Sequence, residues 1–265
     1  MFEFDDNKVY RMPPFFGGDD FDPNTKANVN DVVTINFIQT TCGSWLADYL
    51  PEGFELLRPE LIISFCQLRE VEFMAGSSYN LIQVGVPARF NGIYDQLEGT
   101  FPLVIWENKV RPIIGGREES GQPKIYADIE DLHIYKEKYF TNASYEGNTF
   151  LRLKMVKPQV VSNDELEQIQ ASMENYNVFG WRYIPKVGAP GADLSQPILY
   201  PQSAQIENAW VGEGTVKWIK LNWELNEYQY RILKALSQLP VKGATNVMMT
   251  KGSITMKPFA GHVLK

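Results

Sequence analysis

The stretch VVTINFIQT, Val32–Thr40, begins the series of segments that decides the fold. It is rich in β-branched and aromatic residues, which favour strands, and turn-forming residues separate it from similar segments further along the chain. Those segments begin at Leu61, Tyr79, Phe101, Asn148, Phe179, Thr215 and Asn246. So many strands in succession predict one large, mostly antiparallel sheet that closes, or nearly closes, into a barrel-like structure.

Three segments have the features of helices, namely residues 42–50, 162–176 and 226–240. Ser162 stands three residues before Glu165, which is the spacing of a capping box at a helix N-terminus. The last segment ends at a proline and places a set of large residues on one face: Tyr228, Ile232, Leu233, Leu236 and Leu239. The predicted fold class is therefore α+β, predominantly antiparallel β, with a few helices outside the sheet.

The chain has no internal repeat and no shift of composition that would mark a linker. We therefore predict a single domain over residues 1–265. Residues 1–30 are rich in Pro, Gly and Asp, which indicates an irregular N-terminal arm. We expect the phenylalanines of this arm to anchor it to the rest of the molecule.

Composition and charge limit the classes of partner. The chain is 44% hydrophobic, its formal net charge is -7, and no run is rich in Lys and Arg, so we expect a small ligand and no nucleic acid. The acidic start, MFEFDDNK, is unlike a signal peptide, and no apolar run approaches the about 20 residues that cross a bilayer, so no membrane partner is expected. Cys42 and Cys66 are too few for a disulfide framework, which favours a cytoplasmic location.

Few of the common catalytic groups are present. His133 and His262 are the only histidines, and neither has the spacing of a zinc site, so no metal is expected. The shortage of histidine also argues against a serine triad. What remains is the amine of a lysine, which forms a Schiff base with a ketone without a metal or a cofactor. Such an amine must be neutral, whereas an ordinary lysine, with a pKa near 10.4, is neutral in less than about one part in a thousand at pH 7.

Lys124 is the best candidate for this amine. It lies in GGREESGQPKIYADI, Gly115–Ile129, between Pro123 and Ile125 and after two glycines that we interpret as turn-forming. Apolar neighbours and a nearby cation are the two features that favour a neutral, nucleophilic amine. The simpler interpretation is an ordinary, solvated surface lysine.

This stretch resembles the signature of the acetoacetate decarboxylase family, which runs Gly-Arg-Glu, a short spacer, Pro and the Schiff-base lysine. Other similar segments are YNLIQVGVPARFNG at 79–92, NAWVGEG at 208–214 and LPVKGA at 239–244. The resemblance implies the fold of that family, a homo-oligomer, and Lys124 as the Schiff-base lysine. On this basis we expect Arg117 to bind a carboxylate or tune the amine, and Glu118 to orient Arg117.

The chain departs from the clostridial decarboxylase at several polar positions. Ile125 stands where that enzyme has a second lysine, whose charge helps to keep the reactive amine neutral. Cys66 and Leu81 stand where it has two active-site glutamates, and its substrate-binding arginine falls near Asn30. We therefore expect burial beside Ile125, assisted by Arg117, to favour the neutral amine. At Cys66 we expect an inert, buried thiol.

Four polar residues are candidates to replace the missing groups at a substrate-binding site: Tyr79, Gln83, Glu107 and Gln122. Alternate residues of a strand share one face, so Tyr79 and Gln83 should point the same way as Leu81, which holds one of the matched glutamate positions. The simpler interpretations are a core aromatic for Tyr79 and a strand end for Glu107.

The expected function is that of a Schiff-base lyase that decarboxylates a small β-keto acid, similar to acetoacetate, through an iminium on Lys124. Some divergent relatives catalyse aldol condensation and dehydration with pyruvate, so the resemblance also implies a pyruvate aldolase-dehydratase that uses the same lysine. Because much of the polar support is missing, a third interpretation is a non-catalytic protein that binds a small molecule.

Overall fold

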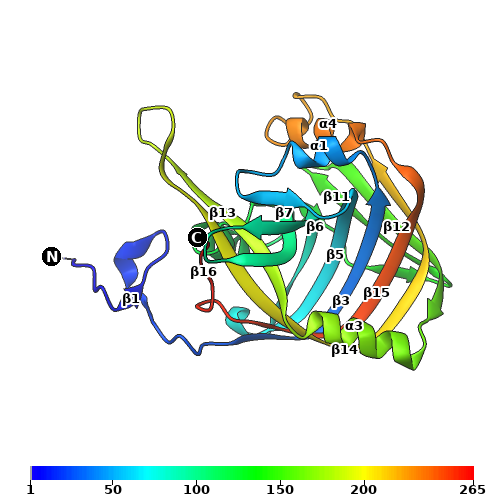
Figure 1. The fold of residues 1–265 in the computed structure, drawn as a ribbon, viewed down its shortest axis with the longest axis horizontal. Helices are drawn as coiled ribbons and strands as arrows, with labels where there is room; N and C mark the ends of the chain where they lie inside the picture. Colours follow the sequence, from blue (N-terminus) through cyan, green and yellow to red (C-terminus); the bar gives the residue numbers. More distant parts are fainter. Residues whose placement is uncertain (1) are drawn as a thin grey trace.

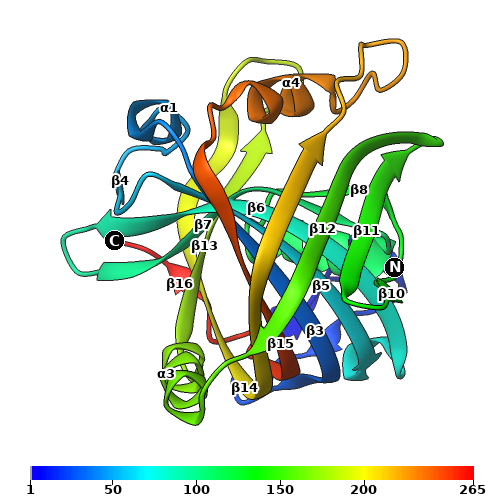
Figure 2. The same ribbon diagram turned by 90° about the vertical axis from the view of Figure 1, so that its right-hand side faces the viewer.

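The chain folds around a closed ring of strands, the strand ring (Figures 1 and 2). The computed structural model describes residues 2–265. In order around the ring, the strands are β14 (Ala192–Trp218), β13 (Tyr176–Pro185), β7 (Gln96–Glu107), β6 (Ser77–Asn91), β5 (Glu60–Val71), β3 (Ala27–Thr40) and β15 (Lys242–Met256). Because β15 pairs again with β14, the sheet is closed, which confirms the predicted fold class.

Strand β14 closes the ring because it is long enough to pair with two neighbours in turn. Its residues 192–202 pair with β13, and its residues 202–213 pair with β15. Its last part pairs with β12 (Asn148–Val160), and β11 (Lys138–Tyr145) and β10 (His133–Tyr135) extend the sheet beyond β12. Every pairing around the strand ring is antiparallel except that of β7 with β13.

Short strands and helices surround the strand ring. The added strands are β4 (Phe54–Leu56), β8 (Lys124–Tyr126), β9 (Asp128–Ile129) and β16 (His262–Val263). The helices are α1 (Gly43–Ala47), α2 (Val110–Glu118), α3 (Asn163–Met173) and α4 (Tyr230–Gln238), with a 3-10 helix, η2, at Glu72–Met74. Helices α1 and α4 lie at one end of the ring and α3 lies at the other (Figures 1 and 2). No helix within residues 2–265 is long and apolar enough to span a membrane.

Helices α1, α3 and α4 confirm the predictions from sequence. The hydroxyl of Ser162 accepts a hydrogen bond from the N–H of Glu165, and the carboxylate of Glu165 accepts one from the N–H of Ser162, so the predicted capping box begins α3. In α4, Leu233 and Leu236 are buried. Tyr228 lies before this helix and is exposed, so it does not belong to the predicted apolar face.

The strands of the ring use their two faces differently. On β5, Ile63 and Phe65 pack in the main hydrophobic core, whereas Ser64 and Cys66 line a cavity. Residues of β3, β6, β7 and β15 alternate between core and cavity in the same way. Side chains from β12 and α4 complete the core. The alternation of a strand therefore supplies both a packed interior and the lining of a site.

The N-terminal arm contains three short elements: β1 (Lys8–Val9), η1 (Pro14–Phe16) and β2 (Asp19–Asp20). It extends away from the strand ring (Figure 1). Phe21 contacts Phe259 at 5.1 Å between ring centroids, whereas Phe2 packs on Phe15 within the arm and Phe16 is 90% exposed. The expectation that phenylalanines anchor the arm holds at Phe21 and is wrong for Phe15 and Phe16, because both face solvent.

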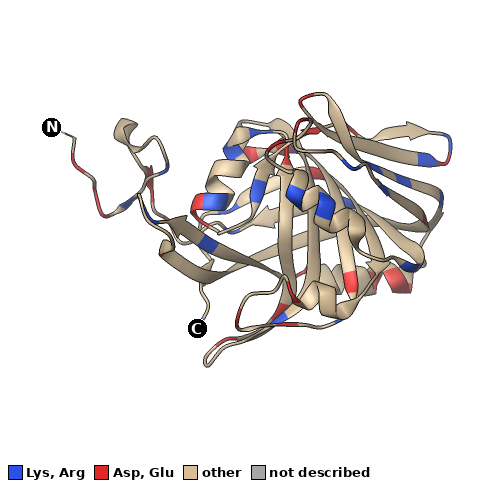
Figure 3. Cartoon of the chain, turned by 90° about the horizontal axis from the view of Figure 1, so that it is seen from above, with Lys and Arg blue, Asp and Glu red and all other residues tan. Residues whose placement is uncertain are grey.

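Acidic and basic side chains are interspersed along the chain (Figure 3). Most ion pairs are exposed, such as Lys157 with Glu213, where both side chains are 67% exposed. One pair differs, because its carboxylate is completely buried. That pair joins Lys124 to Glu107 and marks the candidate site.

Candidate active site

Lys124 is the first residue of β8 and follows the loop that connects α2 to this strand. Strand β8 pairs in parallel with the end of β7, so that Lys124 lies opposite Ile105. Two main-chain hydrogen bonds fix the loop before it: the N–H of Gln122 donates to the carbonyl of Gly116 at 2.9 Å, and the N–H of Ile105 donates to the carbonyl of Pro123 at 3.0 Å. The signature stretch thus forms a helix, a tight loop and a strand, which fixes the starting point of the lysine side chain.

The amine of Lys124 contacts a carboxylate and a carbonyl. Its Nζ lies 2.8 Å from Oε1 of Glu107 and donates a hydrogen bond to the carbonyl oxygen of Pro112 at 3.2 Å. Glu107 is the last residue of β7 and is completely buried, while the side chain of Lys124 is 15% exposed. Glu107 is therefore a strand end, as the simpler interpretation had it, and also the direct partner of the candidate nucleophile.

Burial raises the pKa of Glu107, and the charge of Lys124 opposes this shift only in part. Oε2 of Glu107 has no hydrogen-bond partner among residues 2–265. A carboxyl group that is costly to ionise, with one free oxygen and a lysine amine against the other, is able to accept a proton from that amine and to return it. The pair is therefore suited to proton transfer at Lys124.

Gly116 makes room for the lysine. A Cβ atom at this position would lie 2.5 Å from Cδ and 2.9 Å from Nζ of Lys124. Gly115 and Gly116 belong to α2, so the interpretation of these residues as turn-forming is wrong. At Gly116 the missing side chain serves the close approach of the helix to Lys124, not a turn.

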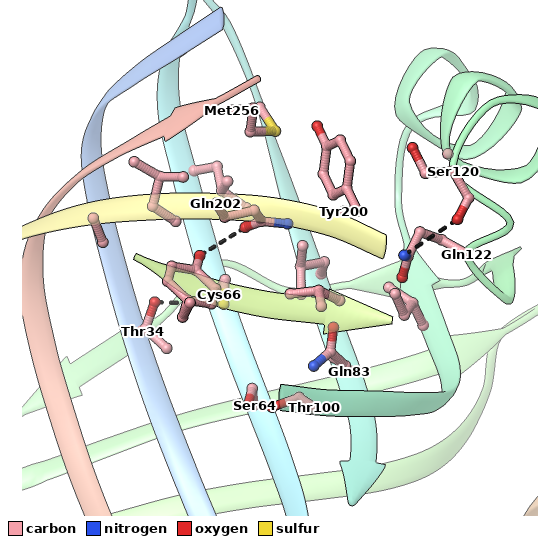
Figure 4. A pocket seen from close by; sticks show the side chains of 18 of the residues that line it. Thr34, Ser64, Cys66, Gln83, Thr100, Ser120, Gln122, Tyr200, Gln202 and Met256 are labelled. Carbon is pink, nitrogen blue, oxygen red and sulfur yellow. Dashed lines mark hydrogen bonds between the residues drawn. The ribbon is translucent and has the colours of Figure 1, made fainter. Parts of the chain in front are cut away.

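Lys124 and Glu107 line a cavity of about 1130 Å³. Figure 4 shows part of its lining, including Gln83 and Gln122. Tyr79, Leu81 and Gln83 of β6 line it together, as the alternation of a strand requires. Tyr79 is buried, and burial together with the negative charge of Glu107 raises the pKa of its phenol, which therefore stays protonated.

Gln122 also lines this cavity. Its Nε2 donates to the carbonyl oxygen of Phe179 at 3.1 Å, while its Oε1 is buried without a partner among the described residues. The structure thus places five of the predicted site residues, Lys124, Glu107, Tyr79, Gln83 and Gln122, around one space.

Residues 11–254 match the family model described as acetoacetate decarboxylase (ADC). The chain belongs to the acetoacetate decarboxylase family. This match covers most of the 265 residues, including the signature stretch and the strand ring except for the end of β15. No curated protein sequence matches the chain.

Solved structures have the same fold. The acetoacetate decarboxylase of Legionella pneumophila matches with a TM-score of 0.75 and 20% identity, over 94% of this chain and 92% of that chain. An acetoacetate decarboxylase-like enzyme from Sphingomonas wittichii RW1 gives 0.69 and 16%, over 91% and 94%. The enduracididine biosynthesis enzyme MppR, in complex with pyruvate, gives 0.70 and 12%, over 97% of each chain. These likenesses show that the chain has the fold of the acetoacetate decarboxylase structures.

The Arg-Glu pair of the family signature lies outside the cavity. Nη1 of Arg117 donates a hydrogen bond to the main-chain oxygen of Lys124 at 2.9 Å. Oε2 of Glu118 accepts one from the N–H of Met12 at 3.3 Å. No hydrogen bond or ion pair joins Glu118 to Arg117 in the described chain, and neither residue lines the cavity. Arg117 therefore supports the main chain beneath the amine, and Glu118 holds the N-terminal arm.

Ile125 does not shield the amine. It is buried in the main hydrophobic core, on the face of β8 opposite to Lys124. Consecutive residues of a strand point to opposite faces, so the apolar surface of Ile125 cannot lie against the lysine that precedes it. The expectation that Ile125 favours the neutral amine is therefore wrong, and the side chain that contacts the amine is Glu107.

Three further polar residues of the cavity are missing from the sequence predictions. Tyr176 donates a hydrogen bond to Oε1 of Gln202 at 2.6 Å, and Tyr200 lies beside them (Figure 4). Burial raises the pKa of both phenols. Tyr200 and Gln202 are alternate residues of β14, which crosses the region 192–214 that the strand pattern did not include. If residues 192–214 had been recognised as a strand, its alternation would have indicated Tyr200 and Gln202 as residues of one face.

Proposed function

We propose that this chain is a Schiff-base lyase that decarboxylates a β-keto acid through an iminium on Lys124. The observation that carries the proposal is the contact, at 2.8 Å, between the amine of Lys124 and the completely buried carboxyl group of Glu107 inside a large cavity. Membership of the acetoacetate decarboxylase family supports the same role for this lysine.

Glu107 provides the proton transfers that the amine needs. Its carboxylate takes a proton from the Lys124 ammonium, and the neutral amine then attacks the ketone carbon of the substrate. The resulting carbinolamine loses its hydroxyl group as water when Glu107 returns the proton. The iminium that forms is cationic, and the carboxylate of Glu107 stabilises it at close range.

The iminium then accepts the electron pair of the carbon–carboxylate bond. This bond breaks, carbon dioxide leaves, and a neutral enamine remains on Lys124. A proton from solvent adds to the enamine carbon and regenerates an iminium, which water hydrolyses to the product ketone and the free lysine. In the net reaction, a β-keto carboxylate and one proton are converted to a ketone and carbon dioxide.

Arg111 is our candidate for the contact with the substrate carboxylate. It lines the cavity from α2, beside Pro112, whose carbonyl accepts a hydrogen bond from the amine. Arg111 has no ion pair in the described part of the chain, whereas Arg11, which also lines the cavity, is held by two carboxylates. We assign this role to Arg111 in place of Arg117. Arg111→Gln should raise KM for acetoacetate and leave trapping of neutral acetone less affected; equal effects on both ligands would contradict it.

Borohydride reduction in the presence of acetoacetate tests the central proposal. Peptide mass spectrometry should find the reduced adduct at Lys124, and Lys124→Ala should remove it. The internal control is Lys109, which lies just before α2 and should stay unmodified. An unmodified Lys124, under conditions that trap a known Schiff-base decarboxylase, would end the proposal.

A pyruvate aldolase-dehydratase is the second candidate, because an enamine on Lys124 is also a nucleophile towards an aldehyde. The likeness of the fold to MppR, a structure solved with pyruvate, favours it. Release of carbon dioxide from acetoacetate distinguishes the first reaction, and an aldol product from pyruvate and an aldehyde distinguishes the second. Thermal stabilisation by keto acids with neither product would instead indicate a non-catalytic binding protein.

We also propose that the chain forms a homo-oligomer. The N-terminal arm exposes Phe15 at 63% and Phe16 at 90%, and Trp45 is 48% exposed at α1. Exposed aromatic residues on an extended arm favour burial against a second copy. Light scattering measures the mass directly, and a monomer at micromolar concentration would contradict this proposal.

A further inference from the structure

The cavity is much longer than a small keto acid. Residues that line it alternate over Val32–Ile38 on β3, Ile62–Leu68 on β5 and Tyr200–Ile206 on β14. Each of these ranges covers about 20 Å at the rise of a strand. The volume, about 1130 Å³, exceeds the roughly 300–1,000 Å³ of pockets that hold drug-sized ligands. Acetoacetate at Lys124 would leave most of this space to water.

The register of the strands shows which lining residues adjoin one another around the wall of the cavity. Glu107 lies opposite Leu81, Leu81 opposite Cys66, Cys66 opposite Thr34 and Thr34 opposite Thr250. All five residues line the cavity. Neighbouring strands lie about 4.8 Å apart, so this row leads about 19 Å along the wall from the carboxyl group beside the amine.

A second row runs parallel to the first. It consists of Ile105, which lies opposite Lys124, and then Gln83, Ser64, Asn36 and Met248. Oγ of Ser64 donates to Oδ1 of Asn36 at 2.6 Å, so these two groups hold each other in place. Ser64 and Gln83 face the cavity in Figure 4. Both rows therefore begin at the candidate nucleophile and end at β15.

The wall that the two rows form is almost free of charged side chains. Glu107 is the one charged residue of the two rows, and the others are apolar or neutral and polar. Tyr200 and Gln202 of β14 also line the cavity, and both are neutral and polar (Figure 4). Such a wall binds apolar surface and donates hydrogen bonds to scattered oxygen atoms. Apart from Lys124, the cationic residues of the cavity, Arg11, Lys26, Arg58 and Arg111, lie outside the two rows.

We propose that the site takes a β-keto acid with a long, uncharged acyl tail that carries keto or hydroxyl oxygens. The keto carbon lies at Lys124, and the tail follows the two rows from β7 across β6 and β5 towards β3. This inference rests on the proposed function of Lys124. It replaces acetoacetate as the preferred substrate and assigns Thr34, Ser64 and Gln83 to recognition of the tail.

A chain-length series tests the inference with the intact protein. The probes are acetoacetate, 3-oxohexanoate and 3-oxododecanoate, and the measurements are carbon dioxide release and borohydride trapping at Lys124. Burial of each methylene improves binding by about fourfold. Burial of only three of the added methylenes would therefore raise kcat/KM for 3-oxododecanoate over acetoacetate by about 60-fold, and we expect at least this ratio.

A variant in the wall locates the tail. Thr34→Phe fills the first row about 14 Å from β7 and should reduce the ratio between 3-oxododecanoate and acetoacetate by about tenfold or more. Val187→Phe is the control, because Val187 is 97% exposed on the loop between β13 and β14, so this variant should leave the ratio unchanged. If Thr34→Phe fails to fold, the series on the unaltered protein remains decisive.

The outcomes separate the two proposals. Equal or falling kcat/KM with chain length, together with an adduct at Lys124, would overturn the long-tailed substrate and leave the Schiff-base function intact. No adduct with any probe would overturn the Schiff-base function, and the inference would fall with it. A high ratio that Thr34→Phe leaves unchanged would overturn the assigned path of the tail.

Discussion

Lys124 and Glu107 come from different elements and meet because β8 lies in parallel beside the end of β7. The amine is on the first residue of β8, and the carboxyl group is on the last residue of β7. A buried ion pair adds little net stability, because desolvation offsets most of the Coulomb attraction, but loss of one partner leaves the other uncompensated. The pair is therefore better explained by chemistry at the amine than by stability of the fold.

Glu107→Gln tests the proton-transfer role at the residue scale. The amide cannot accept the lysine proton, so kcat should fall by about 100-fold or more, in the range that general acid–base groups contribute. Glu213→Gln is the matched control, since Glu213 contacts Lys157 at the same distance, 2.8 Å, in an exposed pair. Steady-state decarboxylation measures both variants, and a similar kcat for the two would contradict the role of Glu107.

The same carboxyl group should make stability depend on pH. Burial raises the pKa of Glu107 in the folded protein, whereas the unfolded chain has the ordinary value near 4.3. Between these values the folded state holds the proton and the unfolded state does not, so the contribution of Glu107 is full below about pH 4 and is lost as pH rises through the folded pKa. Each unit of elevation corresponds to about 1.4 kcal/mol.

Urea unfolding from about pH 4 to pH 8 measures this effect. The free energy of unfolding of the parent, minus that of Glu107→Gln, should decrease as pH rises, because the variant cannot titrate at this position. The substitution also removes the partner of Lys124. This loss changes the difference in free energy of unfolding by the same amount at every pH, so it leaves the slope of the difference against pH unchanged. A difference that is constant across this range would show that Glu107 ionises as an ordinary carboxyl group.

At the scale of elements, α2 approaches Lys124 closely because of Gly116. Gly116→Ala places a methyl group 2.5 Å from Cδ of Lys124, so the lysine must move and kcat should fall by about tenfold or more. Gly115→Ala is the control in the same helix, where the nearest atom to the new Cβ, on Arg111, is 3.6 Å away. That variant should keep its activity and gain up to about 1 kcal/mol of stability from helix propensity. Equal activity in both variants would show that the close approach is unimportant.

Local patterns explain which elements were predictable. The capping box at Ser162 and the alternation at Tyr79 and Gln83 are properties of short stretches, and the structure contains both. Helix α2 was missed because paired glycines usually mark turns, and the reason for Gly116 is a side chain eight residues later in the sequence. Glu107 was among the candidate residues, but its contact with Lys124 was hidden, since nothing in the sequence near Glu107 specifies that β7 and β8 are parallel neighbours.

At the scale of the whole molecule, the closed strand ring gives the site its length. An open sheet would expose the lining of the cavity, whereas pairing of β14 with both β13 and β15 encloses it. The number of strands in the sequence predicted that the sheet closes, but nothing in the sequence indicated which strand would pair with two neighbours in turn and close it. The 27 residues of β14 include prolines and glycines that interrupt the strand pattern, so the pairing partners, not the composition, define this strand.

The N-terminal arm carries the last prediction. Two contacts tie the arm to the signature stretch: Arg11 pairs with Glu119, just after α2, and the N–H of Met12 donates a hydrogen bond to Glu118. The aromatic residues Phe15 and Phe16 of the arm face solvent. If a second copy covers them, Phe16→Ser should lower the oligomer mass measured by light scattering or raise the concentration needed for assembly by about tenfold or more, since a buried phenylalanine contributes about 1.5–3 kcal/mol. Val187→Ser is the control, because Val187 is 97% exposed on the loop between β13 and β14. An unchanged mass at every concentration for Phe16→Ser would show that the arm does not hold the copies together.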